Sequence, residues 1–428
     1  AAEQPDWPGS GFALRMGPAP AVGPADVAWA WQLPAANPFL GEQAQPASRL
    51  AYPLQRRWLA APGASAGGQG VLYWRCCFSQ PLTARIALAV AQAALQQTQA
   101  NAAQLGVGLQ LSATGDSLQM LLQGPAAVLV RVALQAVPCL LEPGPAAWQQ
   151  ARGELLRAPQ SAQMPLRQLL QCLPESLRPL AGQAPLAPEQ WQEGYRPLRL
   201  EVLGVGFAPV EQAAIEAPFS TRAPWPQATP QARPAAGRVW QQLDCASEEA
   251  ALLLFCPQAL PDAAGEAGWR VLAHCYQGAF YQRLRTELQL GYGVFCGFRQ
   301  IQGQAGILFA VQSPHASAQA ILGHVRAFIQ AQGERLAGLD EPAIAQAASA
   351  VRRQLQADAD SLQAFAEQRW QEHLGGLPQS HAVALMQALQ GLARPALLHS
   401  QRLLSQAEGG WRVLATGAAP ARGWTTLS

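Results

Sequence analysis

Hydrophobic and polar positions follow a regular order along the first half of the chain. Alternating apolar residues predict strands, and apolar residues spaced three or four apart predict helices. The predicted elements are a strand at 71–78, a helix at 82–104, a hairpin of strands at 105–111 and 117–121, and a helix at 126–137. We expect the last helix to end at Pro138, because proline lacks the N–H that a helix interior needs.

The second half repeats this order. It predicts a strand at 250–256, a helix at 265–288, a hairpin of strands at 290–295 and 307–312, and a helix at 316–336. Leu105-Gly106 aligns with Leu290-Gly291 at an offset of 185 residues, and the second hairpin is longer by four. We therefore predict an α+β protein of two homologous domains, each an antiparallel sheet with helices packed on one side.

The end of the chain continues with helical patterns. A long Ala- and Gln-rich run at 342–374 and a shorter one at 381–392 both predict helices. A strand at 410–417 is expected to close the second sheet, as a strand at 198–207 closes the first.

Proline and glycine divide the chain into four stretches. Repeated proline blocks helix and strand interiors, so the Pro-rich stretch 217–236 is predicted to be a linker. Residues 1–50 form an Ala-, Pro- and Gly-rich lead-in. The two predicted domains then occupy 51–216 and 237–428.

Composition narrows the function classes. Of 428 residues, 50% are hydrophobic and 13% charged, and 29 basic residues, all of them Arg, stand against 27 acidic ones. This balance argues against a nucleic-acid or membrane-surface partner held by charge. No run approaches 18 apolar residues, and the N-terminus lacks a signal-peptide pattern. We expect the cytoplasm, with the periplasm as the alternative.

The cysteines and the first residue add two expectations. Eight cysteines form no CxxC pair and mostly lie in apolar runs, which is typical of buried thiols in a reducing compartment. The chain begins without Met, so we expect it to be processed or cut from something longer.

Motifs for catalysis are weak in this sequence. The six histidines form neither HExxH nor HxxEH, and the closest string, RWQEH at 369–373, has Arg where His is needed. We interpret Glu372 and His373 as surface helix residues. The letters of a GxSxG elbow at 63–67 lack the strand and helix that such an elbow needs, which indicates a loop. A papain-like Cys–His catalytic pair has no local support in the sequence and is kept as an open alternative.

The segment from 280 to 292 departs from the plain pattern. Arg283 and Arg285 lie in the last turns of a predicted helix, where cations favour the macrodipole. Gly291 is predicted to end the helix as a left-handed cap. Tyr292 would open the hairpin with its ring packed and its hydroxyl free to find a partner.

The repeat sharpens the interpretation of this segment. At the 185-residue offset, Arg285 corresponds to Ala100 and Tyr292 to Val107. The first copy thus keeps the scaffold without the polar groups. Capping and packing alone do not require Arg and Tyr in one copy only, so both are candidate functional residues.

These residues carry a family resemblance. The strings LRTELQLGYGVF at 284–295 and GILFAVQS at 306–313 resemble the fourth domain of the M16 metallopeptidases, the pitrilysin and insulin-degrading-enzyme group. WQLPAANPF at 31–39 resembles the segment that follows the linker between the two halves of these enzymes. RQIQGQAG at 299–306 looks most like the branch that serves coenzyme PQQ biosynthesis.

The resemblance implies a fold and a division of labour. M16 peptidases have two halves of two α+β domains each, which close on a peptide, with a zinc site of HxxEH and a distal Glu in the first domain. This chain would be the C-terminal half, and zinc would be bound by the missing N-terminal half and not by this chain. The partners would be that half, covalent or separate, and a small peptide such as the PQQ precursor or its cross-linked Glu–Tyr form.

The resemblance also gives roles to two residues. The substrate-binding Arg and Tyr of the family match Arg285 and Tyr292, which would contact the peptide carbonyl and the developing oxyanion. The sequence departs at Glu287-Leu288, where the family commonly has Lys-Glu. The alternative is a non-catalytic M16-like scaffold or peptide-binding subunit, which has little need of both residues.

Overall fold

The computed structural model covers most of both predicted domains. It describes residues 36–40, 49–63, 68–78, 84–114, 117–156, 164–177, 191–195, 197–226, 237–245 and 247–427. Most of the lead-in and of the GxSxG string lies outside these residues. Within the described part of the lead-in, Phe39 is buried in the first core, and the Asn37 amide donates to the Asn101 carbonyl at 2.8 Å.

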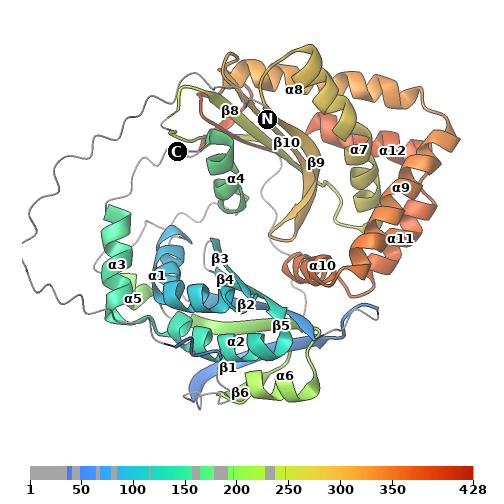
Figure 1. Cartoon of the computed structure of the whole chain (residues 1–428). Coiled ribbons are helices and arrows are strands. Elements are labelled where there is room, and N and C mark those ends of the chain that lie inside the picture. The colour runs from blue at the N-terminus through green and yellow to red at the C-terminus, as the bar shows by residue number, and fades with distance from the viewer. Residues whose placement is uncertain are drawn as a thin grey trace, which may run out of the picture.

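The first sheet has six strands in the order β3-β4-β2-β5-β1-β6 (Figure 1). The strands are β1 (Leu50–Leu59), β2 (Gln69–Phe78), β3 (Gly108–Thr114), β4 (Ser117–Pro125), β5 (Pro197–Val205) and β6 (Phe219–Ala223). Antiparallel pairs join β3, β4, β2 and β5, whereas β1 runs parallel to both β5 and β6.

The second sheet repeats this topology in the order β9-β10-β8-β11-β7-β12. Its strands are β7 (Arg238–Gln242), β8 (Ala250–Pro257), β9 (Gly293–Ile301), β10 (Gln304–Ser313), β11 (Trp411–Ala415) and β12 (Thr425–Leu427). The antiparallel and parallel pairs fall at the same places as in the first sheet. The predicted α+β fold of two homologous units is therefore confirmed, with sheets that are mixed rather than antiparallel throughout.

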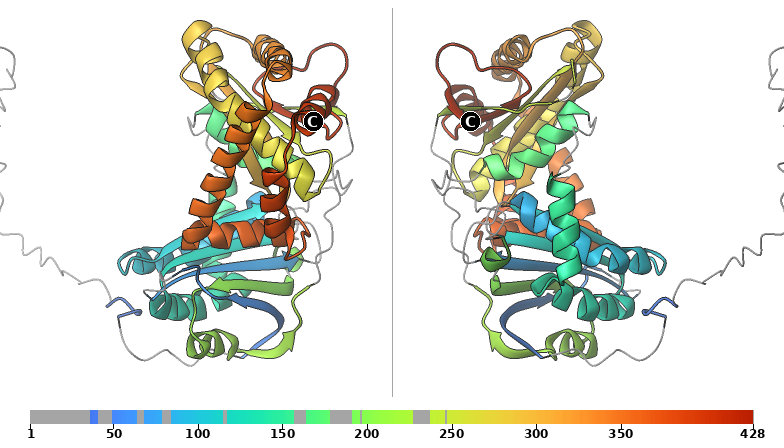
Figure 2. Two further views of the ribbon diagram at one scale, coloured as in Figure 1. Left: turned by 90° about the vertical axis from the view of Figure 1, so that its right-hand side faces the viewer. Right: turned by 90° about the vertical axis from the view of Figure 1, so that its left-hand side faces the viewer.

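Helices cover the outer face of each sheet (Figures 1 and 2). The first unit has α1 (Ala84–Ala103), α2 (Ala126–Leu141), α3 (Pro145–Leu156), α5 (Trp191–Gly194) and α6 (Pro209–Glu216). The second has α7 (Ala263–Tyr281), the π-helical turn η2 (Gln282–Glu287), α8 (Ala318–Ala337), α9 (Glu341–Asp360), α10 (Leu362–Leu374), α11 (His381–Gln390) and α12 (Arg394–Gln406).

Each unit sends one helix to the other sheet. Helix α4 (Pro165–Ser176) comes from the first half of the sequence, but Leu169 and Leu173 pack on the inner face of the second sheet. In return, Trp370 and Leu374 of α10 pack on the inner face of the first sheet. The ribbon views show α10 lying against that sheet (Figures 1 and 2). Both sheets are thus covered on two sides, which is why the strands read as continuous apolar runs instead of strict alternation.

Three details of the predicted elements are wrong. Helix α2 continues through Pro138 to Leu141, because burial of its apolar side outweighs the backbone bond lost at proline. The run at 342–374 is two helices, since the Ser361 side chain accepts from the Ala364 N–H and starts α10. Strands β5 and β11, expected to close their sheets, have partners on both sides.

Two further elements, β6 and α12, were not predicted from the sequence. Strand β6 lies in the stretch predicted as a linker, because Pro218 and Pro224 flank the strand instead of interrupting it. Helix α12 was not predicted, although it opens with Pro395 in its first turn and buries Leu397 and Leu404. Proline in the first helical turn is a helix-start signal.

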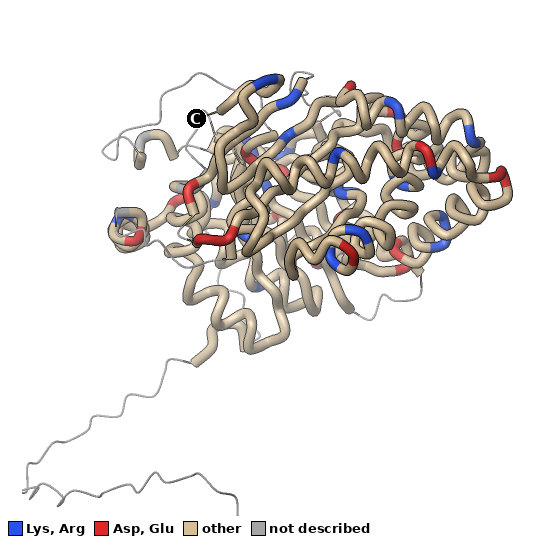
Figure 3. The backbone as a smooth tube through the Cα atoms, turned by 90° about the horizontal axis from the view of Figure 1, so that it is seen from above, with Lys and Arg blue, Asp and Glu red and all other residues tan. Residues whose placement is uncertain are grey.

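Charge and thiols complete the description. Figure 3 shows Arg and the acidic residues interspersed over the described chain. Among the described residues, no single helix is long and apolar enough to cross a membrane. Helices α2 and α3 together reach that length and composition, but the chain bends by 70° between them. The described residues include all eight cysteines and contain no disulfide.

Candidate functional site

The predicted site lies where the long helix of the second unit meets its hairpin. Helix α7 passes into η2, and the chain then turns into β9. Leu284 and Leu290 are buried and joined by a 3.0 Å bond from the Leu290 N–H to the Leu284 carbonyl. These two anchors leave Arg285 and Tyr292 exposed at the joint. A π-helical turn inside a helix is frequent at functional sites.

Gly291 is not the left-handed cap that we predicted. The left-handed residue is Gln289, with φ of 49°, and the backbone of Gly291 has no positive φ. Glycine is needed at 291 for a different reason. A Cβ there would overlap the backbone carbonyl of Gln312, so the turn packs directly on the end of β10.

We expect Gly291→Ala to destabilise the second unit and move Tyr292. The new methyl group would have to displace the backbone of a buried strand end, and overpacking of this kind typically costs about 1–3 kcal/mol. The measurement is a urea unfolding curve. The matched control is Gly323→Ala in α8, where a Cβ meets nothing, and a helical Gly→Ala change is stabilising. Equal stability of the two variants would contradict the argument.

Arg285 is held against the backbone of Tyr292, the second candidate residue. Its Nη1 donates to the Tyr292 carbonyl at 3.0 Å, and its guanidinium lies 5.1 Å from the ring centroid of Tyr281. Arg283 in the same turn is instead occupied by an ion pair with Glu287, at 2.7 Å. The structure therefore brings Arg285 and Tyr292 together and sets Arg283 apart.

The Tyr292 hydroxyl has two side-chain partners. It donates to Glu249 Oε2 at 2.8 Å and accepts from Gln312 Nε2 at 2.7 Å, while its side chain stays 48% exposed. The hydrogen bond to Glu249 raises the pKa of Tyr292. The hydrogen bonds from Gln312 and Tyr292 lower the pKa of Glu249. The hydroxyl has thus found partners within the chain, as expected, whereas the prediction that the Tyr292 ring is packed is wrong.

Gln312 connects this site to the other half of the sequence. Its side chain is buried, and its Oε1 accepts from the backbone N–H of Leu166, the first buried leucine of α4, at 3.2 Å. Sequence reasoning missed Glu249, Gln312 and Leu166. Gln312 alone carried a signal, as an amide that ends an apolar strand.

The equivalent joint of the first unit has no such group. Val107 occupies the place of Tyr292 and is buried, at 2% exposure. Ala100 occupies the place of Arg285 on α1. The two joints follow the same order of helix, turn and strand, but the left-handed residue is Gly106 in the first and Gln289 in the second. The second joint presents a cation and a hydroxyl where the first has Ala100 and Val107.

His373 and Glu372 are not the surface residues that we predicted. His373 Nε2 lies 3.1 Å from Glu201 Oε2 of the first sheet, and both side chains are nearly buried between the units. Burial alone would raise the pKa of Glu201, but the hydrogen bond with His373 and the charges of Arg75 and Arg199 lower it overall. The exchange of α10 between units causes this burial, and the local sequence does not reveal it.

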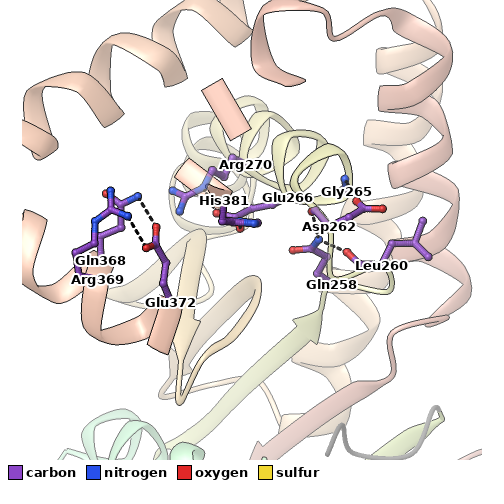
Figure 4. A network of polar contacts seen from close by, with 10 residues as sticks. All are labelled: Gln258, Leu260, Asp262, Gly265, Glu266, Arg270, Gln368, Arg369, Glu372 and His381. Carbon is purple, nitrogen blue, oxygen red and sulfur yellow. Dashed lines mark hydrogen bonds and ion pairs between the residues drawn. The ribbon is translucent and has the colours of Figure 1, made fainter. Parts of the chain in front are cut away.

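A second buried network surrounds the start of α7 (Figure 4). Glu266 contacts His381 Nε2 of α11 and Arg270 Nε, each at 2.7 Å. Burial would raise the pKa of Glu266, but His381 and Arg270 lower it; the hydrogen bond to Glu266 raises the pKa of His381. Nearby, burial raises the pKa of Glu372 although Arg369 opposes the change.

The His381–Glu266 pair gives a pH-dependent stability. His381 stabilises the fold below its ordinary pKa of 6.5, and this is lost as pH rises through its higher folded pKa. Glu266 stabilises it above its ordinary 4.5, and this is lost as pH falls through its lower folded pKa. We expect the melting-temperature difference between wild type and His381→Gln to be largest between pH 4.5 and pH 6.5, where both contributions are present. A difference that stays constant to alkaline pH, or an equal one for the exposed His399→Gln, would contradict this.

The described residues do not form a zinc site. No three His, Cys, Asp or Glu side chains among them gather as metal ligands. His373 and His381 each face a carboxylate that also pairs with arginine, which leaves no open set of ligands around either ring.

Comparison with known sequences identifies the family. The model of the PQQ synthase PqqF C-terminal lobe domain 3 matches residues 69–198, and that of the PqqF-like C-terminal lobe domain 4 matches 271–370. Coenzyme PQQ synthesis protein F of Pseudomonas protegens is 33% identical over 85% of this chain, and that of Pseudomonas aeruginosa is 35% identical over 82%. The chain belongs to the PqqF family. This PqqF-like chain spans 43–44% of the length of these two relatives.

Solved structures share the fold of the PqqF-like chain. Pitrilysin superposes with a TM-score of 0.65 at 15% identity, over 92% of this chain and 48% of pitrilysin. A peptidase M16 inactive domain from Pseudomonas fluorescens superposes with a TM-score of 0.57 at 12% identity, over 88% of this chain and 100% of that one. At these identities the likeness concerns the fold alone.

Proposed function

We propose that this chain is the C-terminal, non-zinc-binding half of an M16 zinc metallopeptidase that acts in coenzyme PQQ biosynthesis, in the cytoplasm. One observation carries the proposal. Arg285 and Tyr292 are exposed side by side at one of two equivalent joints, while the other joint has Ala100 and a buried Val107. The relatives named Coenzyme PQQ synthesis protein F supply the pathway.

The substrate would be a short peptide, the precursor peptide of PQQ. Arg285 would place a fixed cation beside a peptide carbonyl, and Tyr292 would donate its hydroxyl to the oxygen on which charge develops. In this proposal the zinc site belongs to the N-terminal half of the enzyme, as the resemblance to the M16 metallopeptidases implies. That half would be the partner of this chain, on the same polypeptide or a separate one.

The test is reconstitution. The chain is mixed with an N-terminal half that carries HxxEH, and cleavage of the precursor peptide is followed by mass spectrometry, with bound zinc measured in the same assembly. Each half alone is the control. We expect cleavage by the assembly and none by this chain alone.

The second candidate is a non-catalytic scaffold or peptide-binding subunit. A structure described as an M16 inactive domain has the same fold, so the fold alone is compatible with both candidates. An assembly that binds the peptide but retains no zinc and cleaves nothing would decide for the scaffold.

A further inference from the structure

The proton of the Tyr292 hydroxyl is already in use within the chain. A neutral phenol carries one O–H, and here it donates to Glu249 Oε2 at 2.8 Å. Gln312 Nε2 donates to the phenol oxygen at 2.7 Å and also to Glu249. While these bonds stand, Tyr292 has no proton to offer to a peptide carbonyl.

A backbone N–H of α4, which comes from the first half of the sequence, fixes which end of the Gln312 amide faces Tyr292 and Glu249. An amide can present either its oxygen or its nitrogen to a neighbour. The backbone N–H of Leu166 in α4 donates to Gln312 Oε1 at 3.2 Å, so the NH₂ group faces Tyr292 and Glu249. With Gln312 acting as a donor, Glu249 is the acceptor that fixes the direction of the Tyr292 proton.

The remaining groups at the joint do not compete for this proton. Arg285 contributes donors only, and one of them is already bonded to the Tyr292 carbonyl. The carboxylate of Glu287, in η2, pairs with Arg283. Glu249 is partly exposed in the turn before β8, so water can solvate its carboxylate when the bond to Tyr292 is given up.

We propose that Glu249 is a positioning residue: its carboxylate accepts the hydrogen bond of the Tyr292 O–H until a peptide carbonyl replaces it as the acceptor. This rests on the proposed function of Tyr292 as a donor to the peptide. The exchange breaks no covalent bond: the O–H turns from one acceptor to another, and Glu249 keeps the amide of Gln312. Because only the released hydroxyl binds substrate, the resting bond raises the apparent KM.

Two measurements on Glu249→Ala test this, with Glu248→Gln as the matched control that removes a charge one residue away. The first is the Tyr292 pKa in this chain, from phenolate absorbance as the difference between proteins with and without Tyr292→Phe. We expect that pKa to fall toward its ordinary value in Glu249→Ala alone, because the carboxylate that raises it is gone. The second is peptide cleavage by the reconstituted enzyme, where we expect KM to fall about fivefold with kcat retained.

The outcomes are distinct. An unchanged Tyr292 pKa would mean that Glu249 does not hold the hydroxyl in solution, and the proposal would be wrong. A fallen pKa with a loss in kcat as large as that of Tyr292→Phe would make Glu249 part of the reaction and also overturn it. If Tyr292→Phe leaves cleavage unchanged, the proposed function itself fails, and the titration still reports whether the Glu249 bond exists.

Discussion

Replacing Trp370 with Ala should cost about 3–5 kcal/mol of stability, the usual range for deleting a large buried aromatic side chain. Trp370 is 1% exposed and anchors α10 of the second unit on the first sheet. Its ring stacks on Tyr73 with centroids 5.1 Å apart, and its Nε1 donates to Gln119 Oε1 at 3.0 Å. The variant would therefore lose packing and leave a buried amide oxygen unsatisfied at the contact between the units.

A short series of variants separates these causes. Trp370→Phe keeps a ring but removes the N–H and part of the ring volume, so it should cost less than Trp370→Ala. The unsatisfied oxygen of Gln119 should account for about 1–3 kcal/mol of this loss. Val383→Ala on α11 is the control, since this side chain is 62% exposed and should change stability by less than about 0.5 kcal/mol. Unfolding in urea gives the three values. A loss in Trp370→Ala no larger than that of Val383→Ala would mean that α10 does not hold the units together.

The duplicated fold could be predicted because its signals are local. The apolar runs of β2 and β8, the hairpins that follow and the long helices all repeat at nearly one spacing, and the two sheets share one strand order. Strands β1 and β7 could not be found in this way. Each is held by a parallel partner far along the chain, and Pro53, Arg56 and Arg57 interrupt the apolar pattern of β1.

The exchange of helices also escapes a local pattern. An amphipathic helix shows that it has an apolar side but not which sheet covers that side. Thus α4 was absent from the predicted elements, and His373 was interpreted as exposed although it lies against Glu201, 172 residues away.

Only the part of the candidate site that is local in sequence could be predicted. The asymmetry between the two copies singled out Arg285 and Tyr292, which lie seven residues apart and in contact. The partners that fix Tyr292 are more distant: Gln312 is 20 residues away, Glu249 is 43, and the Leu166 N–H that orients Gln312 is 146 from it. Only the folded sheet brings these groups together.

The same pair carries the largest expected effect on activity. In the reconstituted enzyme, Arg285→Ala and Tyr292→Phe should each lower kcat/KM by about 10²–10³-fold, the usual loss when one donor to a developing oxyanion is removed. Tyr292→Phe deletes the hydroxyl alone. Arg285→Ala also removes the 3.0 Å bond to the Tyr292 carbonyl, so it should disturb the position of Tyr292. The double variant should then lose less than the product of the two single losses, because groups that act as a unit are not additive.

Two neighbouring variants make this result specific. Arg283→Ala removes a cation from the same turn, but that cation is paired with Glu287. Tyr281→Phe removes a hydroxyl from an exposed ring at the end of the same helix. Both should leave kcat/KM within a few-fold of wild type. If Arg283→Ala costs as much as Arg285→Ala, general charge at the joint would explain the loss. If neither Arg285→Ala nor Tyr292→Phe slows cleavage, the two residues are surface groups of a scaffold, because a donor to the reacting carbonyl cannot be removed without raising the barrier.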